Sequence, residues 1–148
     1  MHPILEAAAA RQWGLFTAAD ARRAGYGHDE TRSLCSTRTW VRLRRGVYTT
    51  AGRLASLPTH RHAADCLATL LFLGRAGAVI SHSSAALLLG VPVPRGLVRE
   101  VRLTDPDLWR TGRGLRMARA PLAGDEIVRR GPFPLTSAAR TLVDCARE

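Results

Sequence analysis

The sequence predicts a mixed α/β (α+β) chain with two domains, and three observations support this prediction. Apolar residues make up 46% of the 148 residues, which is enough for one substantial core or two small ones. Segments with helical periodicity alternate with short segments that are rich in β-forming residues. Residues 51–58 resemble a linker between two such patterns. We therefore expect one domain at residues 1–54 and a small mixed α/β domain at residues 55–148.

Three helices are predicted near the N-terminus. Residues 4–12 can place their apolar side chains on one face of a helix. Thr17 and Asp20 have the spacing of a capping box, which begins a second helix at residues 18–24. Residues 28–37 form the third helix, because acidic side chains in its first turn complement the helix dipole.

A β-hairpin is predicted directly after these helices. Residues 40–43 and 47–50 are rich in β-forming residues, and the turn between them contains Gly46. Two helices joined by a short glycine-containing turn, with one helix before them and a hairpin behind, are typical of a winged helix-turn-helix. The sequence therefore predicts this fold for the N-terminal domain.

The C-terminal domain is predicted to alternate helices and strands. Pro58 fits the first turn of a helix at residues 59–73, and residues 78–81 resemble a buried strand. Ser83 is the predicted N-cap of the next helix, which ends before Gly90.

Half-buried strands and a terminal helix are expected in the rest of this domain. Apolar and charged residues alternate over residues 98–103 and 115–118, as they do in half-buried strands. Residues 131–135 contain two prolines and are predicted to be a loop or an edge. Either Thr136 or Ser137 caps a last helix.

The net charge of +10 favours a polyanionic partner. All 22 basic residues are arginines and only 12 residues are acidic. Neutralising phosphates with such side chains releases condensed counterions and favours binding to nucleic acid. Five of these arginines and several hydroxyl side chains fall between residues 30 and 45.

The predicted DNA contacts lie on the third helix and the hairpin. Arg32, Ser33 and Ser36 share a helix face opposite Leu34 and Cys35, and this face suits base edges and phosphates in a major groove. The hairpin arginines would reach phosphates or the minor groove. The alternative is a solvated basic face without a ligand. The predicted DNA-binding residues are Arg32, Ser33, Ser36, Arg38, Arg42, Arg44 and Arg45.

Aromatic residues beside the hairpin have two interpretations. Trp40 and Tyr48 could stack on nucleic-acid bases, as aromatic side chains do in single-strand binding sites. Such residues more often pack a hairpin onto its helices. We therefore predict that both belong to the core.

Catalysis and metal binding find little support in the sequence. The segment 82–84 combines His with Ser, but it lacks the G-x-S-x-G pattern, and neighbouring side chains at a strand end point apart. His60 and His62 do not face each other on a helix. The acidic residues 105, 107, 125 and 126 are predicted to be loop and cap residues. We expect no enzymatic activity, no catalytic residue, no metal and no cofactor.

The location predicted for the chain is the cytoplasm. Cys35, Cys66 and Cys145 are far apart and form no C-x-x-C pair, which fits a reducing compartment. The N-terminus lacks the pattern of a signal peptide, and the apolar run at residues 67–74 is too short to span a bilayer. A membrane partner is therefore not expected.

Several blocks together resemble the AbiEi-type antitoxins of bacterial type IV toxin-antitoxin systems, in particular the actinobacterial branch. The blocks are G-L-F-T at residues 14–17, Gly25, W-V-R-L-R-R-G-V-Y at 40–48, I-S-H-S-S-A-A at 80–86 and L-T-S-A-A-R-T-L-V-D at 135–144. They extend over nearly the whole chain, and none contains a catalytic constellation.

The resemblance implies a DNA-binding antitoxin. Its winged helix-turn-helix would repress its own operon by binding inverted repeats in double-stranded operator DNA. The remainder would help to counter a nucleotidyltransferase-like toxin, without necessarily binding it. Family members are usually about twice this length, and actinobacterial ones often continue into a domain that resembles a Vsr-type endonuclease, so a truncated chain or a short relative is expected.

Two alternatives remain open from the sequence. The chain could be a protein-interaction module whose second domain docks a toxin or another partner. It could also be the DNA-targeting half of a longer Vsr-like nuclease. A stable complex without duplex affinity would favour the first, and metal-dependent cleavage by a longer protein would favour the second.

Overall fold

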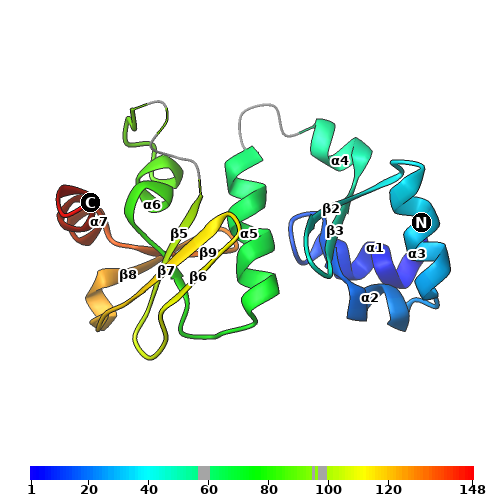
Figure 1. The fold of residues 1–148 in the computed structure, drawn as a ribbon, viewed down its shortest axis with the longest axis horizontal. Helices are drawn as coiled ribbons and strands as arrows, with labels where there is room; N and C mark the ends of the chain where they lie inside the picture. The colour runs from blue at the N-terminus through cyan, green and yellow to red at the C-terminus, as the bar shows by residue number, and fades with distance from the viewer. Residues whose placement is uncertain (57–60, 95, 97–99) are drawn as a thin grey trace. The chain divides into compact units, whose positions relative to one another are not determined.

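A computed structural model describes residues 1–56, 61–94, 96 and 100–148, which form a mixed α/β fold (Figure 1). The fold class predicted from the sequence is therefore confirmed. The chain divides into two compact units, Met1–Phe72 and Leu73–Glu148. The sequence instead predicts a functional boundary between residues 54 and 55, and that boundary stays a prediction.

The first unit combines short helices with a small antiparallel sheet in the order β1-β3-β2. Its elements in chain order are α1 (Pro3–Ala10), β1 (Leu15–Thr17), α2 (Ala18–Arg23), α3 (His28–Ser36), β2 (Trp40–Arg44), β3 (Val47–Thr50), α4 (Ala51–Ala55) and most of α5 (Arg61–Leu73).

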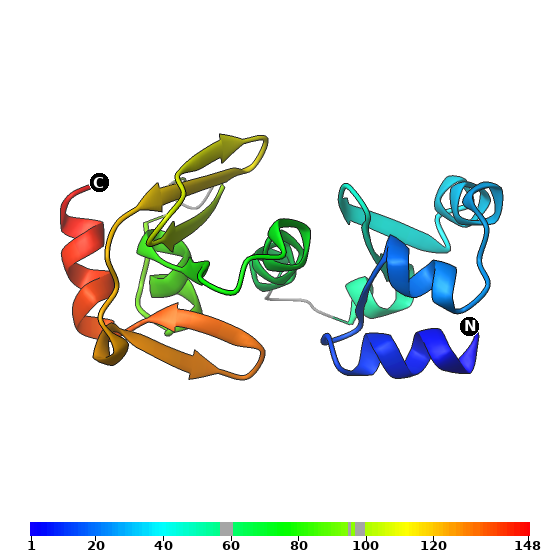
Figure 2. The same ribbon diagram turned by 90° about the horizontal axis from the view of Figure 1, so that it is seen from below.

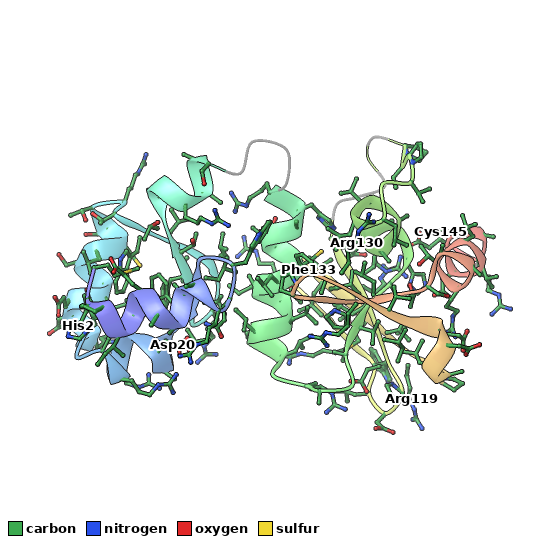
Figure 3. All side chains as sticks on the ribbon, turned by 180° about the vertical axis from the view of Figure 1, so that it is seen from behind. His2, Asp20, Arg119, Arg130, Phe133 and Cys145 are labelled. Carbon is green, nitrogen blue, oxygen red and sulfur yellow. The ribbon has the colours of Figure 1, made fainter. Side chains whose placement is uncertain are left out.

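The predicted capping box at the start of α2 is confirmed. The Thr17 hydroxyl accepts a hydrogen bond from the Asp20 amide at 3.1 Å, and the Asp20 carboxylate accepts one from the Thr17 amide at 2.8 Å. Asp20, labelled in Figure 3, is buried and also accepts from the Gln12 side chain and pairs with Arg23. These contacts begin α2 directly at the end of β1.

The predicted linker at residues 51–58 contains a helix, so this prediction was wrong for residues 51–55. The Thr50 hydroxyl caps α4 by accepting from the Arg53 amide at 3.1 Å. The Arg53 guanidinium lies over the Trp13 ring, 5.5 Å from its centroid, and Nε donates to the Trp13 carbonyl. A cap and a tertiary anchor therefore stabilise a segment whose composition resembles a loop. Pro58 and Thr59 lie outside the described residues.

The second unit is built on a six-stranded mixed sheet in the order β6-β7-β5-β4-β9-β8. The pairs β5–β7 and β4–β9 are parallel, and the β6–β7 and β8–β9 hairpins form its two edges (Figure 2). Its elements are β4 (Val79–Ile80), α6 (His82–Leu88), β5 (Val101–Asp105), β6 (Arg110–Gly112), β7 (Leu115–Arg119), the 3-10 turn η1 (Gly124–Glu126), β8 (Ile127–Arg130), β9 (Phe133–Thr136) and α7 (Ala138–Ala146).

Strand β9 corrects the prediction that residues 131–135 form a loop or an edge. It lies inside the sheet, between β4 and β8, and Leu135 is fully buried. Pro134 lacks an amide hydrogen, but β4 pairs with β9 only at Leu135, so this position need not donate toward β4. The edge strands β6 and β8 are mostly exposed, so no apolar alternation marked them in the sequence.

Two predicted helix caps in this unit have different outcomes. Helix α7 begins after Ser137, whose hydroxyl accepts from the Arg140 amide, as predicted. Helix α6 begins at His82 with Ser81 at its N-cap, so the prediction of Ser83 as the cap was wrong. Residues 98 and 99 of the predicted strand 98–103 lie outside the described residues. None of the described helices combines the length and apolar character needed to cross a membrane.

Asp105 is a buried member of β5, which corrects its prediction as a loop residue. Its carboxylate accepts two hydrogen bonds from Arg75, at 2.8 and 3.1 Å, and two from the amides of Asp107 and Leu108. The hydrogen bond from Arg75 is the main cause that lowers the pKa of Asp105, and it outweighs burial, which raises that pKa. The ion pair therefore joins the segment before β4 to the end of β5.

Replacing this carboxylate should destabilise the second unit in a pH-dependent way. Folding lowers the pKa of Asp105, so its contribution is complete above the ordinary value of 3.8 and is lost as the pH falls from there through the lower pKa of the folded state. We expect Asp105→Asn to lower the melting temperature at pH 7 by about 5–10 °C. Thermal melting at pH values from 7 to 3 measures both effects.

The exposed Asp125 in η1 provides a matched control for this experiment. Asp125→Asn removes the same charge without a comparable set of donors, and it should leave the melting temperature nearly unchanged. An Asp105→Asn protein whose melting temperature falls between pH 5 and 3 as steeply as that of the parent chain would contradict the argument.

Candidate nucleic-acid interface

Helix α3 has one face on the core and one face in solvent. Leu34 and Cys35 are half-buried and pack against the core of the first unit. Arg32, Ser33 and Ser36 are exposed on the helix. The predicted division of this helix into a packed face and a polar face is confirmed.

An aromatic cluster holds α3 and the hairpin in place. Trp40, at the start of β2, is 4% exposed, and its ring centroid lies 4.8 Å from that of Phe16 and 4.9 Å from that of Tyr26. Tyr48 of β3 stacks at 6.1 Å from Phe16 and is half-buried. The prediction that Trp40 and Tyr48 belong to the core is confirmed.

A β-bulge separates the hairpin arginines. Arg42 pairs with Tyr48 in the register, and Arg44 pairs with Val47, so β2 has one extra residue between them. Neighbouring residues of β3 point to opposite faces, and therefore Arg42 and Arg44 also point to opposite faces. Arg42 is exposed, as is Arg45 in the turn, whereas Arg44 is half-buried.

Arg44 is engaged within its own unit. Its Nε donates a hydrogen bond to the hydroxyl of Thr69 on α5 at 3.1 Å. Burial lowers the pKa of this guanidinium, and the nearby Asp65 and Cys66 act in the opposite direction. The structure thus leaves Arg42 and Arg45 exposed on the hairpin, whereas Arg44 contacts α5.

Arg38 ends α3 in an unusual backbone conformation. Its φ is +60°, in the left-handed region that glycine normally occupies at this position. The Arg38 amide donates to the carbonyl of Cys35, and the Thr39 amide donates to that of Leu34, which closes the last turn. A left-handed arginine costs about 1–2 kcal/mol relative to glycine, so its exposed cationic side chain is a candidate functional group. The sequence alone offers no sign of this strain.

The charge on α3 is uneven. Asp29 and Glu30 occupy its first turn and are exposed, so the basic part of the helix begins at Arg32. Burial raises the pKa of the Cys35 thiol and the charge of Arg42 lowers it, which reflects the closeness of β2 to this helix. The exposed cations at Arg32, Arg38, Arg42 and Arg45 therefore belong to one helix and the hairpin beside it.

Total charge does not distinguish the two units. Met1–Phe72 has ten arginines and five acidic residues, and Leu73–Glu148 has twelve and seven, so each unit has a formal charge of +5. The units differ instead in which of their arginines are exposed and which are half-buried.

The remaining sequence candidates form no metal centre in the part of the chain that the structure describes. No group of three or more His, Cys, Asp or Glu side chains there could hold a metal ion. In the segment 82–84, His82 is hydrogen-bonded to Ser81 and not to the following serines.

A scan against protein-family models and a search of curated proteins found no match to the chain.

Removing the central aromatic residue should destabilise the first unit. We expect Trp40→Ala to lower its free energy of unfolding by about 3–5 kcal/mol, because a large buried side chain leaves a cavity. Trp109→Ala is the matched control, since Trp109 is 65% exposed and should change stability by less than about 0.5 kcal/mol. Urea unfolding followed by circular dichroism measures both variants. Equal losses in the two variants would show that the Trp40 cluster does not stabilise the unit as described.

Proposed function

We propose that the first unit is a winged helix-turn-helix domain that binds double-stranded operator DNA, and that the chain is an autorepressing antitoxin. The observation that carries this proposal is the polar face of α3 beside exposed hairpin arginines. The opposite face of α3 packs on the core, so Arg32, Ser33 and Ser36 can contact a ligand without unfolding.

The chemistry of this surface suits a DNA groove. Arginine donates two parallel hydrogen bonds to guanine O6 and N7, and serine hydroxyls bond to several base edges. In the proposed complex, Arg32, Ser33 and Ser36 read the major groove. Arg38, Arg42 and Arg45 contact phosphates, where charge provides affinity but little sequence discrimination.

The antitoxin role rests on the sequence blocks and not on the geometry of the interface. The ordered pair of blocks at residues 40–48 and 80–86 resembles AbiEi-type antitoxins. On this proposal the chain acts in the cytoplasm, represses its own operon through inverted repeats, and counters a nucleotidyltransferase-like toxin through the second unit.

The hairpin arginines provide the test of DNA binding. Fluorescence anisotropy with a duplex from the region upstream of the gene gives affinity as a function of salt. We expect Arg42→Ala/Arg45→Ala to weaken binding at least tenfold, and to reduce the slope of log affinity against log salt by about 2, because two phosphate contacts are lost. Arg32→Ala should instead reduce the difference in affinity between the operator duplex and a duplex of scrambled sequence.

A matched double variant controls for the loss of charge. Arg11→Ala/Arg129→Ala removes two exposed arginines outside α3 and the hairpin and should retain most of the affinity. If both double variants lose affinity equally, binding is a diffuse property of the +10 chain, and the proposed interface is wrong.

Antitoxicity has a separate test in living cells. A nucleotidyltransferase-like product of an adjacent gene should arrest growth when expressed alone, and co-expression of this chain should restore growth. Persistent arrest, despite soluble expression of both proteins, would refute the antitoxin role. A stable co-purifying complex without any duplex affinity would instead support a protein-interaction module.

A further inference from the structure

The second unit contains a hollow of about 690 Å³, which lies in the range of small-molecule sites. Its lining comes from α6, β5, β7, α7 and residues 91–94. One part of the lining is apolar and includes Leu142 and residues 91–94. The other part is polar and includes His82, Ser83 and Arg102. Cys145 on α7, labelled in Figure 3, also borders it.

Two buried polar atoms of this lining have no hydrogen-bond partner among the described residues. They are the Ser83 hydroxyl and the Arg102 Nε, and Ser83 is only 2% exposed. A buried polar group without a partner destabilises the folded protein. Both residues line one hollow, and the two atoms themselves are closed off from solvent, so a ligand that accepts hydrogen bonds would satisfy both after a small rotation of each side chain.

His82 is held in a strained and specific arrangement beside them. Its φ is +52°, a backbone conformation that residues other than glycine rarely adopt. The Thr104 hydroxyl donates to the Ser81 hydroxyl at 2.8 Å, and Ser81 Oγ lies 2.7 Å from His82 Nδ1. With Ser81 accepting from Thr104, its own proton is directed to Nδ1, so the neutral ring carries its proton on Nε2.

The arrangement of His82 replaces an ordinary helix cap. Ser81 is the N-cap of α6, yet its side chain makes no capping hydrogen bond, because the hydroxyl contacts His82 instead. Burial lowers the pKa of His82, and the charge of Arg102 lowers it further. The charge of Asp144 raises this pKa, and that of Arg140 lowers it. The imidazole is therefore neutral near pH 7, and Nε2 is a hydrogen-bond donor without a partner among the described side chains.

The charge of the lining favours an anion. Arg102, Arg116 and Arg147 border the hollow, and Glu148 is the one acidic side chain among its lining residues. Glu148 pairs with Arg102 through NH1, which leaves Nε unpartnered. Arg116 is also paired, with Glu100 at 3.3 Å. Burial lowers the pKa of Arg102, and Arg116 lowers it further, and a bound anion would offset both effects.

The neighbouring carboxylate does not cancel this preference. Asp144 is buried and pairs with Arg140, whose Nε donates a hydrogen bond to Oδ1 at 3.0 Å, while Oδ2 has no partner among the described residues. Asp144 is not among the lining residues.

We propose that this hollow binds a small organic phosphate monoester, a function distinct from the DNA binding proposed for the first unit. The phosphate accepts hydrogen bonds from Ser83, His82 and Arg102. A phosphate monoester has three strong acceptor oxygens, one for each of these donors, and its charge of about −1.5 to −2 at pH 7 exceeds the single charge of a carboxylate. The apolar part of the ligand lies against Leu142 and residues 91–94.

Three ligands separate the contributions of charge and apolar contact. Isothermal titration of the full chain would use phenyl phosphate, inorganic phosphate and benzoate. We expect phenyl phosphate to bind about tenfold more tightly than either of the others, because only it combines a dianion with an apolar ring. Equal affinity for benzoate would overturn the choice of phosphate, and equal affinity for inorganic phosphate would overturn the apolar subsite.

Ser83→Ala separates a binding role from a structural one. This substitution should weaken phenyl phosphate binding about tenfold, since a hydrogen bond to a charged group is lost. It should also leave the melting temperature of the free protein unchanged or raise it, because the buried hydroxyl has no partner. Arg102→Lys keeps a positive charge but lacks Nε, and we expect weakened binding here as well.

Arg119 is the control for charge on the surface of the same unit. Arg119→Ala removes an exposed guanidinium of β7, labelled in Figure 3, and should leave phenyl phosphate affinity unchanged. The proposal is wrong if phenyl phosphate gives no saturable binding, or if Ser83→Ala binds as tightly as the parent chain. A lower melting temperature in Ser83→Ala would assign the hydroxyl a structural role and would also overturn it.

Discussion

The burial of Trp40 against Phe16 and Tyr26 determines how the first unit presents its polar residues. These rings come from β2, β1 and the segment between α2 and α3, so one cluster joins three parts of the chain. Each aromatic ring can bury about 150–250 Å², which makes the cluster a large share of a small core. Since α3 packs its apolar side on this core, its polar residues remain in solvent.

Both units contain residues whose backbone conformation is unusual for a residue other than glycine, and the side chain of each makes a contact or carries a charge of its own. The non-glycine residues with positive φ among those described are Trp13, Arg38 and His82. The Trp13 ring lies under Arg53, Arg38 carries an exposed charge at the end of α3, and His82 borders a hollow. Such conformations persist only where the surrounding structure compensates for their cost. The two proposed sites each contain one of them.

The same surplus charge serves different purposes in the two units. In the first unit, most of the arginines near α3 and the hairpin are exposed, which suits a long polyanion that is bound at the surface. In the second, Arg102 is largely withdrawn from solvent beside unpartnered polar atoms, which suits a small anion that loses much of its water on binding. Burial, and not net charge, therefore distinguishes the proposed ligands.

Local patterns in the sequence by themselves determined the mixed α/β class, the capping box at Thr17, the cap at Ser137 and the two faces of α3. Each of these depends on residues within a few positions of one another. Only the tertiary structure decided that Arg44 is separated from Arg42, that Asp105 is buried on Arg75, and that Ser81 holds His82 through Thr104. The physical reason is that a bulge, a buried ion pair and a hydroxyl chain depend on strand register and on contacts between segments distant in sequence.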